Sequence, residues 1–146
     1  DDSLDAALGG DGTPTVGQLH GGESPERCLA LKQRYPQVDW WKALRFRSSN
    51  DLHSLERYAP SVDALLLDAW SPDQLGGTGH RLSLDGLGAI ELDLPWWLAG
   101  GISAEWIPEL IQRVDPDGLD ASSRLEIRPG WKDLKKVSAL LSAVRP

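Results

Sequence analysis

A single carboxylate at the end of a strongly apolar run is the first feature of this sequence that could do chemistry. Three leucines at 65–67 lead into Asp68, and a loop containing Gly76, Gly77 and Gly79 follows. An apolar run bounded in this way by Pro and Gly is typical of a strand buried on both faces. A charge at its exit should face a site, because burying it unpaired costs several kcal/mol. Asp68 could then be a general acid, a base or a metal ligand, or it could simply cap the next turn.

The residues around Asp68 narrow these choices. No cluster of His, Cys, Asp or Glu with ligand spacing accompanies it, so we expect no metal. The three loop glycines lack the spacing of Walker or dinucleotide-binding motifs, so we expect no cofactor. They either let the backbone approach a substrate closely or form a plain surface loop.

A pair of turns made of small residues is the second candidate feature. Gly100 and Gly101 stand in "LAGGIS" (98–103), and Ser122 and Ser123 stand in "LDASS" (119–123). A strand followed by glycines and a helix start offers free backbone N–H groups to an anion. The glycines alone could equally make a tight corner. Two such turns one unit apart favour a phosphate site, since barrels often build one after their last two strands.

Two further residues have side chains that could react. His20, in "QLHGGES" (18–24), also ends a strand candidate, and we assign it to the lining of the site, although a lone histidine more often serves packing. Cys28 lies within a helix that has strong start signals and apolar neighbours. We interpret Cys28 as a core residue and not as a nucleophile.

The elements that must position these residues alternate along the chain. Strands are predicted at 15–20, 38–46, 63–70, 94–100 and 118–123, and helices at 24–35, 48–59, 83–90 (weak), 103–114 and 133–144. This alternation indicates a parallel α/β architecture. Polar or small residues follow nearly every strand, which favours a TIM-type (β/α) barrel over an open doubly wound sheet with one switch point. A full barrel takes eight units and this chain has five, so a partial barrel is expected.

Hydrophobic spacing predicts which side chains face the core. In each of the pairs Trp40–Trp41 and Trp96–Trp97, one ring should face the barrel interior and the other the helix layer. The helical positions expected to point inward are Ile107, Leu110, Ile111 and Val114 in 103–114, and Leu134, Val137, Leu140, Leu141 and Val144 in 133–144.

The composition bounds the class of protein. A chain of 146 residues suits one domain, which we place at 15–146 after an acidic lead-in, or remnant of a preceding helix, at 1–14. A net charge of −7 argues against binding to nucleic acid or to a membrane surface. One cysteine, no signal peptide and no apolar span fit a soluble cytoplasmic protein. The chain has no methionine, and its opening reads like the middle of a longer sequence.

Five segments together resemble the phosphoribosylanthranilate isomerase family. They are "VGQLHGGES", "VDALLLDAW", "LGGTG", "LAGGIS" and "DGLDASSRLEIRPGWKD". Their order and spacing are those of the family, and the residues of the motifs are most similar to those of cyanobacterial members. The resemblance covers the chain from about residue 15 to the C-terminus. It implies an eight-unit barrel of which this chain supplies units four to eight. It also implies an Amadori rearrangement of N-(5-phosphoribosyl)anthranilate in tryptophan biosynthesis.

The resemblance also implies roles for individual residues. Asp68 matches the general acid that protonates the ribose ring oxygen, and His20 matches a histidine near the substrate. Gly76, Gly77 and Gly79 match the loop over the substrate. The turns at Gly100–Gly101 and Ser122–Ser123 match the phosphate-binding loops.

The sequence departs from the family's pattern at two places. The family's general base is a cysteine in a "KICG" context that this sequence lacks, so we expect the chain by itself to be inactive. Arg124 stands where the family has glycine. If the backbone there needs a positive φ, arginine would cost roughly 1 kcal/mol or somewhat more; alternatively its guanidinium could bind the phosphate.

Two other functions remain open at this stage. The chain could be another ribose-phosphate-binding barrel with different chemistry. It could also be a non-enzymatic half-barrel remnant that serves as an association module, because five strands would expose two parallel edges. Its expected partners are the small phosphoribosyl substrate and either the first three barrel units or a second copy of itself.

Overall fold

The computed structural model describes residues 2–9, 12–68 and 84–144 of the 146-residue chain. The predicted loop glycines Gly76, Gly77 and Gly79 lie outside these residues. The helices are α1 (Asp2–Leu8), α2 (Pro25–Arg34), α3 (Leu52–Tyr58), α4 (Leu84–Leu87), α5 (Ile107–Arg113) and α6 (Leu134–Val144), with short 3₁₀ helices at Ser49–Asp51, Ala59–Ser61 and Ser123–Leu125. The strands are β1 (Val16–Leu19), β2 (Asp39–Arg45), β3 (Ala64–Asp68), β4 (Trp96–Ala99), β5 (Gly118–Leu119), β6 (Glu126–Arg128) and β7 (Trp131–Lys132).

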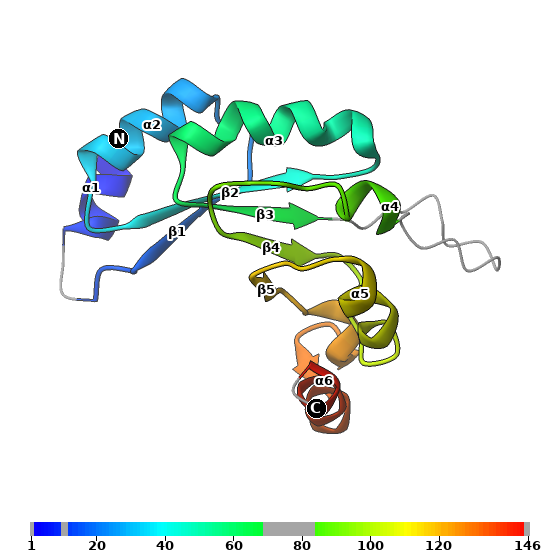
Figure 1. Cartoon of the computed structure of the whole chain (residues 1–146). Helices are drawn as coiled ribbons and strands as arrows, with labels where there is room; N and C mark the ends of the chain where they lie inside the picture. Colours follow the sequence, from blue (N-terminus) through cyan, green and yellow to red (C-terminus); the bar gives the residue numbers. More distant parts are fainter. Residues whose placement is uncertain (1, 10–11, 69–83, 145–146) are drawn as a thin grey trace.

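Strands β1 to β5 form one sheet in which every pair is parallel and the spatial order follows the chain. An open doubly wound sheet reverses its strand order at a switch point, and this sheet does not. Helices α2 and α3 lie over one face of β1 to β3, and the chain continues through β4 and β5 toward α5 and α6 (Figure 1). The sheet is therefore a five-stranded segment of the (β/α) barrel type, as the sequence predicts.

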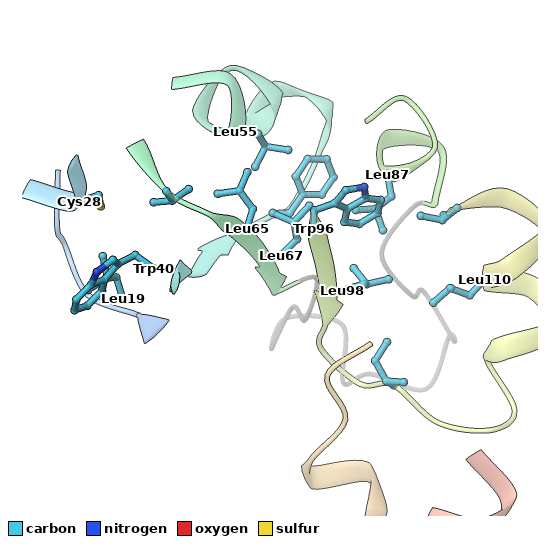
Figure 2. Packing of buried hydrophobic residues seen from close by; sticks show 14 of the residues in the cluster. Leu19, Cys28, Trp40, Leu55, Leu65, Leu67, Leu87, Trp96, Leu98 and Leu110 are labelled. Carbon is cyan, nitrogen blue, oxygen red and sulfur yellow. The ribbon is translucent and has the colours of Figure 1, made fainter. Parts of the chain in front are cut away.

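The main core lies between the sheet and its helices. Leu65 and Leu67 of β3 and Leu98 of β4 are fully buried there, together with the nearly buried rings of Trp40 and Trp96 (Figure 2). Burying a leucine side chain stabilises the fold by about 1.5–3 kcal/mol relative to exposure. The leucine run of β3 thus fixes the strand that ends at Asp68.

The opposite face of the sheet carries a second, smaller cluster. Ala43, Leu66 and Ala99 are buried in it, and Trp97 packs against them. The rings of Trp97 and Trp41 are 4.9 Å apart between centroids. One ring of each tryptophan pair thus faces the helices and the other faces the inner side of the sheet, which confirms the prediction.

Proline stands near the start of two of the helices. The Ser24 hydroxyl accepts a hydrogen bond from the backbone N–H of Arg27 at 3.3 Å, and Pro25 occupies the first helical position of α2. Pro108 stands in the first turn of α5, where its missing N–H costs nothing.

The apolar stripes of α5 and α6 are only partly buried, which corrects the prediction. Ile111 of α5 is 53% exposed, and Leu134 and Leu141 of α6 are 77% and 55% exposed. Val144 is also exposed. On α6, Leu140 is buried instead, and the partly buried Val137 and Ala143 pack against the same core.

Two further features of the structure are absent from the sequence prediction. Residues Glu126–Arg128 and Trp131–Lys132 pair as the antiparallel strands β6 and β7. The predicted strand 118–123 is regular only at Gly118–Leu119, and a 3₁₀ helix begins at Ser123. Among the described residues, no helix has the length and apolar character needed to cross a membrane.

Candidate active site

The carboxyl ends of β1, β3, β4 and β5 open onto one pocket of about 320 Å³. Parallel strands place their carboxyl ends at one edge of a sheet, which is where barrels and α/β sheets bind ligands. The lining residues are Gln18, His20, Leu66, Asp68, Ala99, Gly100, Gly101, Ile102, Asp120, Ser122, Ser123 and Arg124. Most candidates from the sequence therefore share a single pocket.

Asp68 is the last residue of β3, and alternation along that strand puts it on the same side as Leu66. Its backbone is fixed, because its carbonyl accepts a hydrogen bond from the N–H of Phe46 at 3.0 Å. Asp68 is half-buried, and Leu66 and Ala99 line the same pocket. Asp68 thus combines a fixed backbone with partly apolar neighbours.

The turn after β4 has a backbone that favours glycine. Gly100 and Gly101 have φ angles of +96° and +70°, a region that L side chains rarely adopt. Because neither residue carries a Cβ atom, a ligand could approach the backbone of this turn closely. Both glycines line the pocket.

The turn after β5 is held by a lysine that the sequence analysis did not single out. Lys132 of β7 donates hydrogen bonds to the carbonyl oxygen and to Oγ of Ser122, both at 3.1 Å. The same ammonium forms an ion pair with Glu126 at 2.8 Å, and this hydrogen bond lowers the pKa of the Glu126 carboxyl. The β6–β7 hairpin therefore orients the Ser122 turn through Lys132.

The structure removes one of the two alternatives for Arg124, the strained backbone. Among the described residues, only glycines have positive φ, so arginine causes no strain of that kind here. Arg124 lies in the 3₁₀ helix Ser123–Leu125, and it is an exposed residue of the pocket lining. It is the one arginine among the described lining residues, which also include Asp68 and Asp120.

His20 follows β1 directly and lines the same pocket. Its Nδ1 lies 3.3 Å from Oε1 of Gln18, a residue two positions earlier on the same side of the strand. Cys28 is fully buried in α2, and burial raises the pKa of its thiol. This agrees with its interpretation as a core residue. Among the described residues, no group of three or more His, Cys, Asp or Glu side chains could hold a metal ion.

Six residues of this region were not predicted from the sequence: Gln18, Leu66, Ala99, Ile102, Asp120 and Lys132. The alternation of side chains would have found Gln18 and Leu66, because each lies two positions before a chosen residue of the same strand. Asp120 follows the last residue of β5 directly. Lys132 gives no local signal, since it reaches the site only through the hairpin.

Comparison with known proteins identifies a family. The family model described as N-(5'phosphoribosyl)anthranilate (PRA) isomerase matches residues 12–143. A curated relative from Thermosynechococcus vestitus, named N-(5'-phosphoribosyl)anthranilate isomerase, is 48% identical over 125 residues, which cover 86% of this chain and 54% of the relative. The chain spans between 54% and 62% of the length of such relatives.

Solved structures agree on the fold. The phosphoribosyl anthranilate isomerase of Thermotoga maritima superposes with a TM-score of 0.75 at 26% identity, over 90% of this chain and 62% of that one. Another such isomerase was solved in complex with reduced 1-(o-carboxyphenylamino)-1-deoxyribulose 5-phosphate. It superposes with a TM-score of 0.69 at 22% identity, over 90% of this chain and 59% of that one.

Proposed function

Because the chain belongs to the phosphoribosylanthranilate isomerase family, we propose that its pocket binds the phosphoribosyl substrate of that reaction. In this proposal Asp68 is the general acid of an Amadori rearrangement in tryptophan biosynthesis. Gly100, Gly101, Ser122, Ser123 and Arg124 bind the phosphate, and His20 contacts the rest of the substrate. Gly76, Gly77 and Gly79 lie outside the described residues and stay assigned to the loop over the substrate by resemblance alone.

One observation carries the proposal: the acid and the two anion-binding turns line one pocket although they come from three different strands. Asp68 ends β3, Gly100 and Gly101 follow β4, and Ser122 follows β5. A phosphate held at one end of such a pocket leaves the sugar directed toward the carboxylate. The protein is acidic overall, with a net charge of −7, so an anionic ligand needs this local set of backbone N–H groups and cations.

The chemistry assigned to Asp68 is proton donation to the ribose ring oxygen. The bond between that oxygen and C1 breaks, and the nitrogen lone pair forms a C1=N double bond. A base then removes the proton from C2, and the resulting enol tautomerises to the ketone of the ribulose product. A positioned general acid contributes roughly 10²- to 10⁴-fold to such a step.

The family's base is a cysteine, and the described pocket lining contains none. Cys28 is the one cysteine of the chain, and it is fully buried in the helix layer. We therefore propose the activity for the barrel that these five strands form with the remaining strands of the family. Those strands could belong to the same polypeptide or to another one.

Exposed apolar surface supports an association of this kind. The edge strands of the described sheet are β1 and β5, and its inner face carries the rings of Trp41 and Trp97. Leu134 and Leu141 of α6 are also exposed. Apolar surface and free strand edges are typical sites of association. A cytoplasmic location belongs to the same proposal, because a single buried cysteine suits a reducing compartment.

The function is tested by co-expressing this chain with a segment that carries the first three strand–helix units of the Thermosynechococcus relative. We expect the purified complex to isomerise N-(5'-phosphoribosyl)anthranilate. The reaction is measured as the loss of substrate fluorescence. Replacing Asp68→Asn in the same complex is the matched control and should abolish most of the rate. A folded complex with the measured mass of both segments but no isomerase activity would refute the proposal.

A further inference from the structure

A buried lysine on β2 lies behind His20 and has no part in the function proposed so far. Lys42 is 1% exposed, in the middle of a strand whose neighbouring outward side chains, Trp40 and Leu44, are apolar. Removing an ammonium group from water costs several kcal/mol unless hydrogen bonds replace the water. An apolar side chain would fill this position at lower cost, so the charge calls for an explanation.

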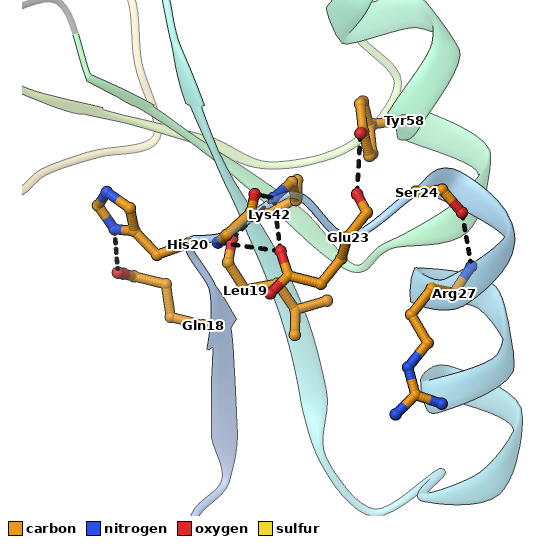
Figure 3. Close-up of polar contacts among 9 residues, drawn as sticks. Gln18, Leu19, His20, Glu23, Ser24, Arg27, Lys42 and Tyr58 are labelled. Atoms are coloured by element: carbon orange, nitrogen blue, oxygen red, sulfur yellow. Dashed lines mark hydrogen bonds and ion pairs between the residues drawn. The ribbon is translucent and has the colours of Figure 1, made fainter.

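All three N–H donors of the Lys42 ammonium are used, and all are directed at the connection between β1 and α2. The ammonium donates to the carbonyl oxygens of Leu19 at 3.3 Å and Gly21 at 2.7 Å, and to Oε2 of Glu23 at 2.8 Å (Figure 3). Leu19 and Gly21 are the two neighbours of His20 in the chain. Lys42 therefore holds the backbone on both sides of the histidine.

Glu23 closes the same connection from its other end. Its Oε2 also accepts the backbone N–H of Gly21 at 3.0 Å, and its carbonyl oxygen accepts the Tyr58 hydroxyl at 2.9 Å (Figure 3). A Cβ atom on Gly21 would lie only 2.9 Å from Oε1 of Glu23, so a side chain there would displace the carboxylate. The hydrogen bond from Lys42 lowers the pKa of the Glu23 carboxyl.

The connection needs such an anchor because of its composition. His20 is followed by Gly21 and Gly22, and glycine has more backbone freedom to lose on folding than any other residue. Nothing lies within 4 Å of a Cβ built on Gly22. Without the contacts to Lys42, the His20 ring would be tied to the pocket mainly by its contact with Gln18.

We propose that Lys42 is a positioning residue that fixes His20 at the rim of the pocket through the Glu23-closed connection. The inference rests on the proposed function, because it assumes that His20 contacts the part of the ligand beyond its phosphate. Lys42 itself does not line the pocket. It acts on the ligand only through His20.

Calorimetric titration with two probes tests the proposal, on the complex of this chain with the first three strand–helix units described above. The first probe is inorganic phosphate, and the second is reduced 1-(o-carboxyphenylamino)-1-deoxyribulose 5-phosphate. We expect Lys42→Met to weaken the second probe by about tenfold, the value of one hydrogen bond to the ligand, and to leave phosphate affinity unchanged. His20→Ala should have the same effect, and Lys42→Met in the His20→Ala background should add nothing further.

Lys32 offers a matched control. Its ammonium also forms an ion pair, with Asp63 at 2.7 Å, and donates to a backbone carbonyl, that of Val62 at 3.1 Å. These partners precede β3, at the opposite end of the sheet from the pocket. Lys32→Met should therefore leave both affinities unchanged. If Lys42→Met does not fold, Glu23→Gln keeps an acceptor for Lys42 and should weaken the second probe alone by a smaller factor.

The outcomes separate the two levels of inference. If the complex with the unaltered chain binds neither probe, the proposed function is wrong and the role of Lys42 falls with it. If that complex binds both probes and Lys42→Met matches it, or loses affinity for phosphate as well, the positioning role is refuted while the function stands. Additive losses in the double variant with His20→Ala would also refute it, because Lys42 would then act independently of His20.

Discussion

Replacing Arg124 tests the phosphate site most sharply, because the sequence left two opposite interpretations of this residue. The structure gives it no positive φ and places it in the pocket lining with an exposed side chain. Its contribution should therefore be estimated with the dielectric constant of water. Two unit charges 4 Å apart then attract by about 1 kcal/mol.

A bound phosphate carries a charge of about −1.5 to −2 at neutral pH. The expected loss for Arg124→Ala is therefore about 1.5–2 kcal/mol, or roughly a 10- to 30-fold weaker binding of inorganic phosphate. Titration calorimetry at low ionic strength measures it directly. In 1 M salt the Debye length falls to about 3 Å, so the difference between the variant and the unaltered chain should shrink.

Arg128 provides the matched control for this experiment. It lies four positions later, its guanidinium stacks 4.1 Å from the centre of the Trp131 ring, and it does not line the pocket. Arg128→Ala should leave phosphate affinity unchanged. Equal affinities for Arg124→Ala and the unaltered chain, or equal losses in both variants, would refute the assignment of Arg124.

The same position distinguishes strain from binding. If arginine were strained at 124, glycine would relieve about 1 kcal/mol or more and raise the melting temperature. Because the backbone there is not in the left-handed region, we expect Arg124→Gly to melt no higher than Arg124→Ala. A higher melting temperature of the glycine variant in thermal unfolding would show that the reading of the backbone is wrong.

Three further predictions follow from other parts of the structure. A Cβ on Gly118 would lie 2.6 Å from ring atoms of Trp97. Gly118→Ala should therefore cost about 1–3 kcal/mol of stability and lower the melting temperature by about 2–4 °C per kcal/mol. Gly22→Ala is the control, because a Cβ there meets open space and should cost no stability; equal melting temperatures of the two variants would contradict the prediction. In the complemented barrel, Asp68→Asn should lower kcat by roughly 10²- to 10⁴-fold and leave inorganic phosphate affinity unchanged; retained turnover would exclude Asp68 as the acid. The hydrogen bond with Lys42 depresses the pKa of Glu23 below its ordinary value of 4.5. The stabilising contribution of Glu23 is therefore complete above pH 4.5 and is lost as the pH falls through the depressed pKa. In denaturant titrations across this acid range, the stability of Glu23→Gln should depend less on pH, and an unchanged dependence would refute the assignment.

Much of the framework could be predicted from local sequence patterns. The leucine run at 65–67 specifies a strand buried on both sides, and the structure buries all three side chains. The Ser24–Pro25 pair specifies the start of α2. The glycine pair at 100–101 specifies a turn, and both residues adopt positive φ. These features depend on a few adjacent residues, so sequence reasoning reaches them.

Features that depend on distant partners were out of reach. A lysine inside the apolar strand "VDWWKALRF" gives no sign that its ammonium reaches Gly21, a residue from another strand–helix unit. Strands β6 and β7 have only three and two residues, too few to show periodicity. The apolar stripe of α6 is wider than the surface that covers it, so spacing alone could not separate buried Leu140 from exposed Leu141.

The most direct test is a crystal structure of this chain with reduced 1-(o-carboxyphenylamino)-1-deoxyribulose 5-phosphate bound. It should show the phosphate group on the N–H groups of 100–101 and 122–124, within reach of the Arg124 guanidinium. The Asp68 carboxyl group should lie within hydrogen-bonding distance of the sugar-derived chain. A ligand bound elsewhere, or an Asp68 side chain directed away from it, would contradict the account.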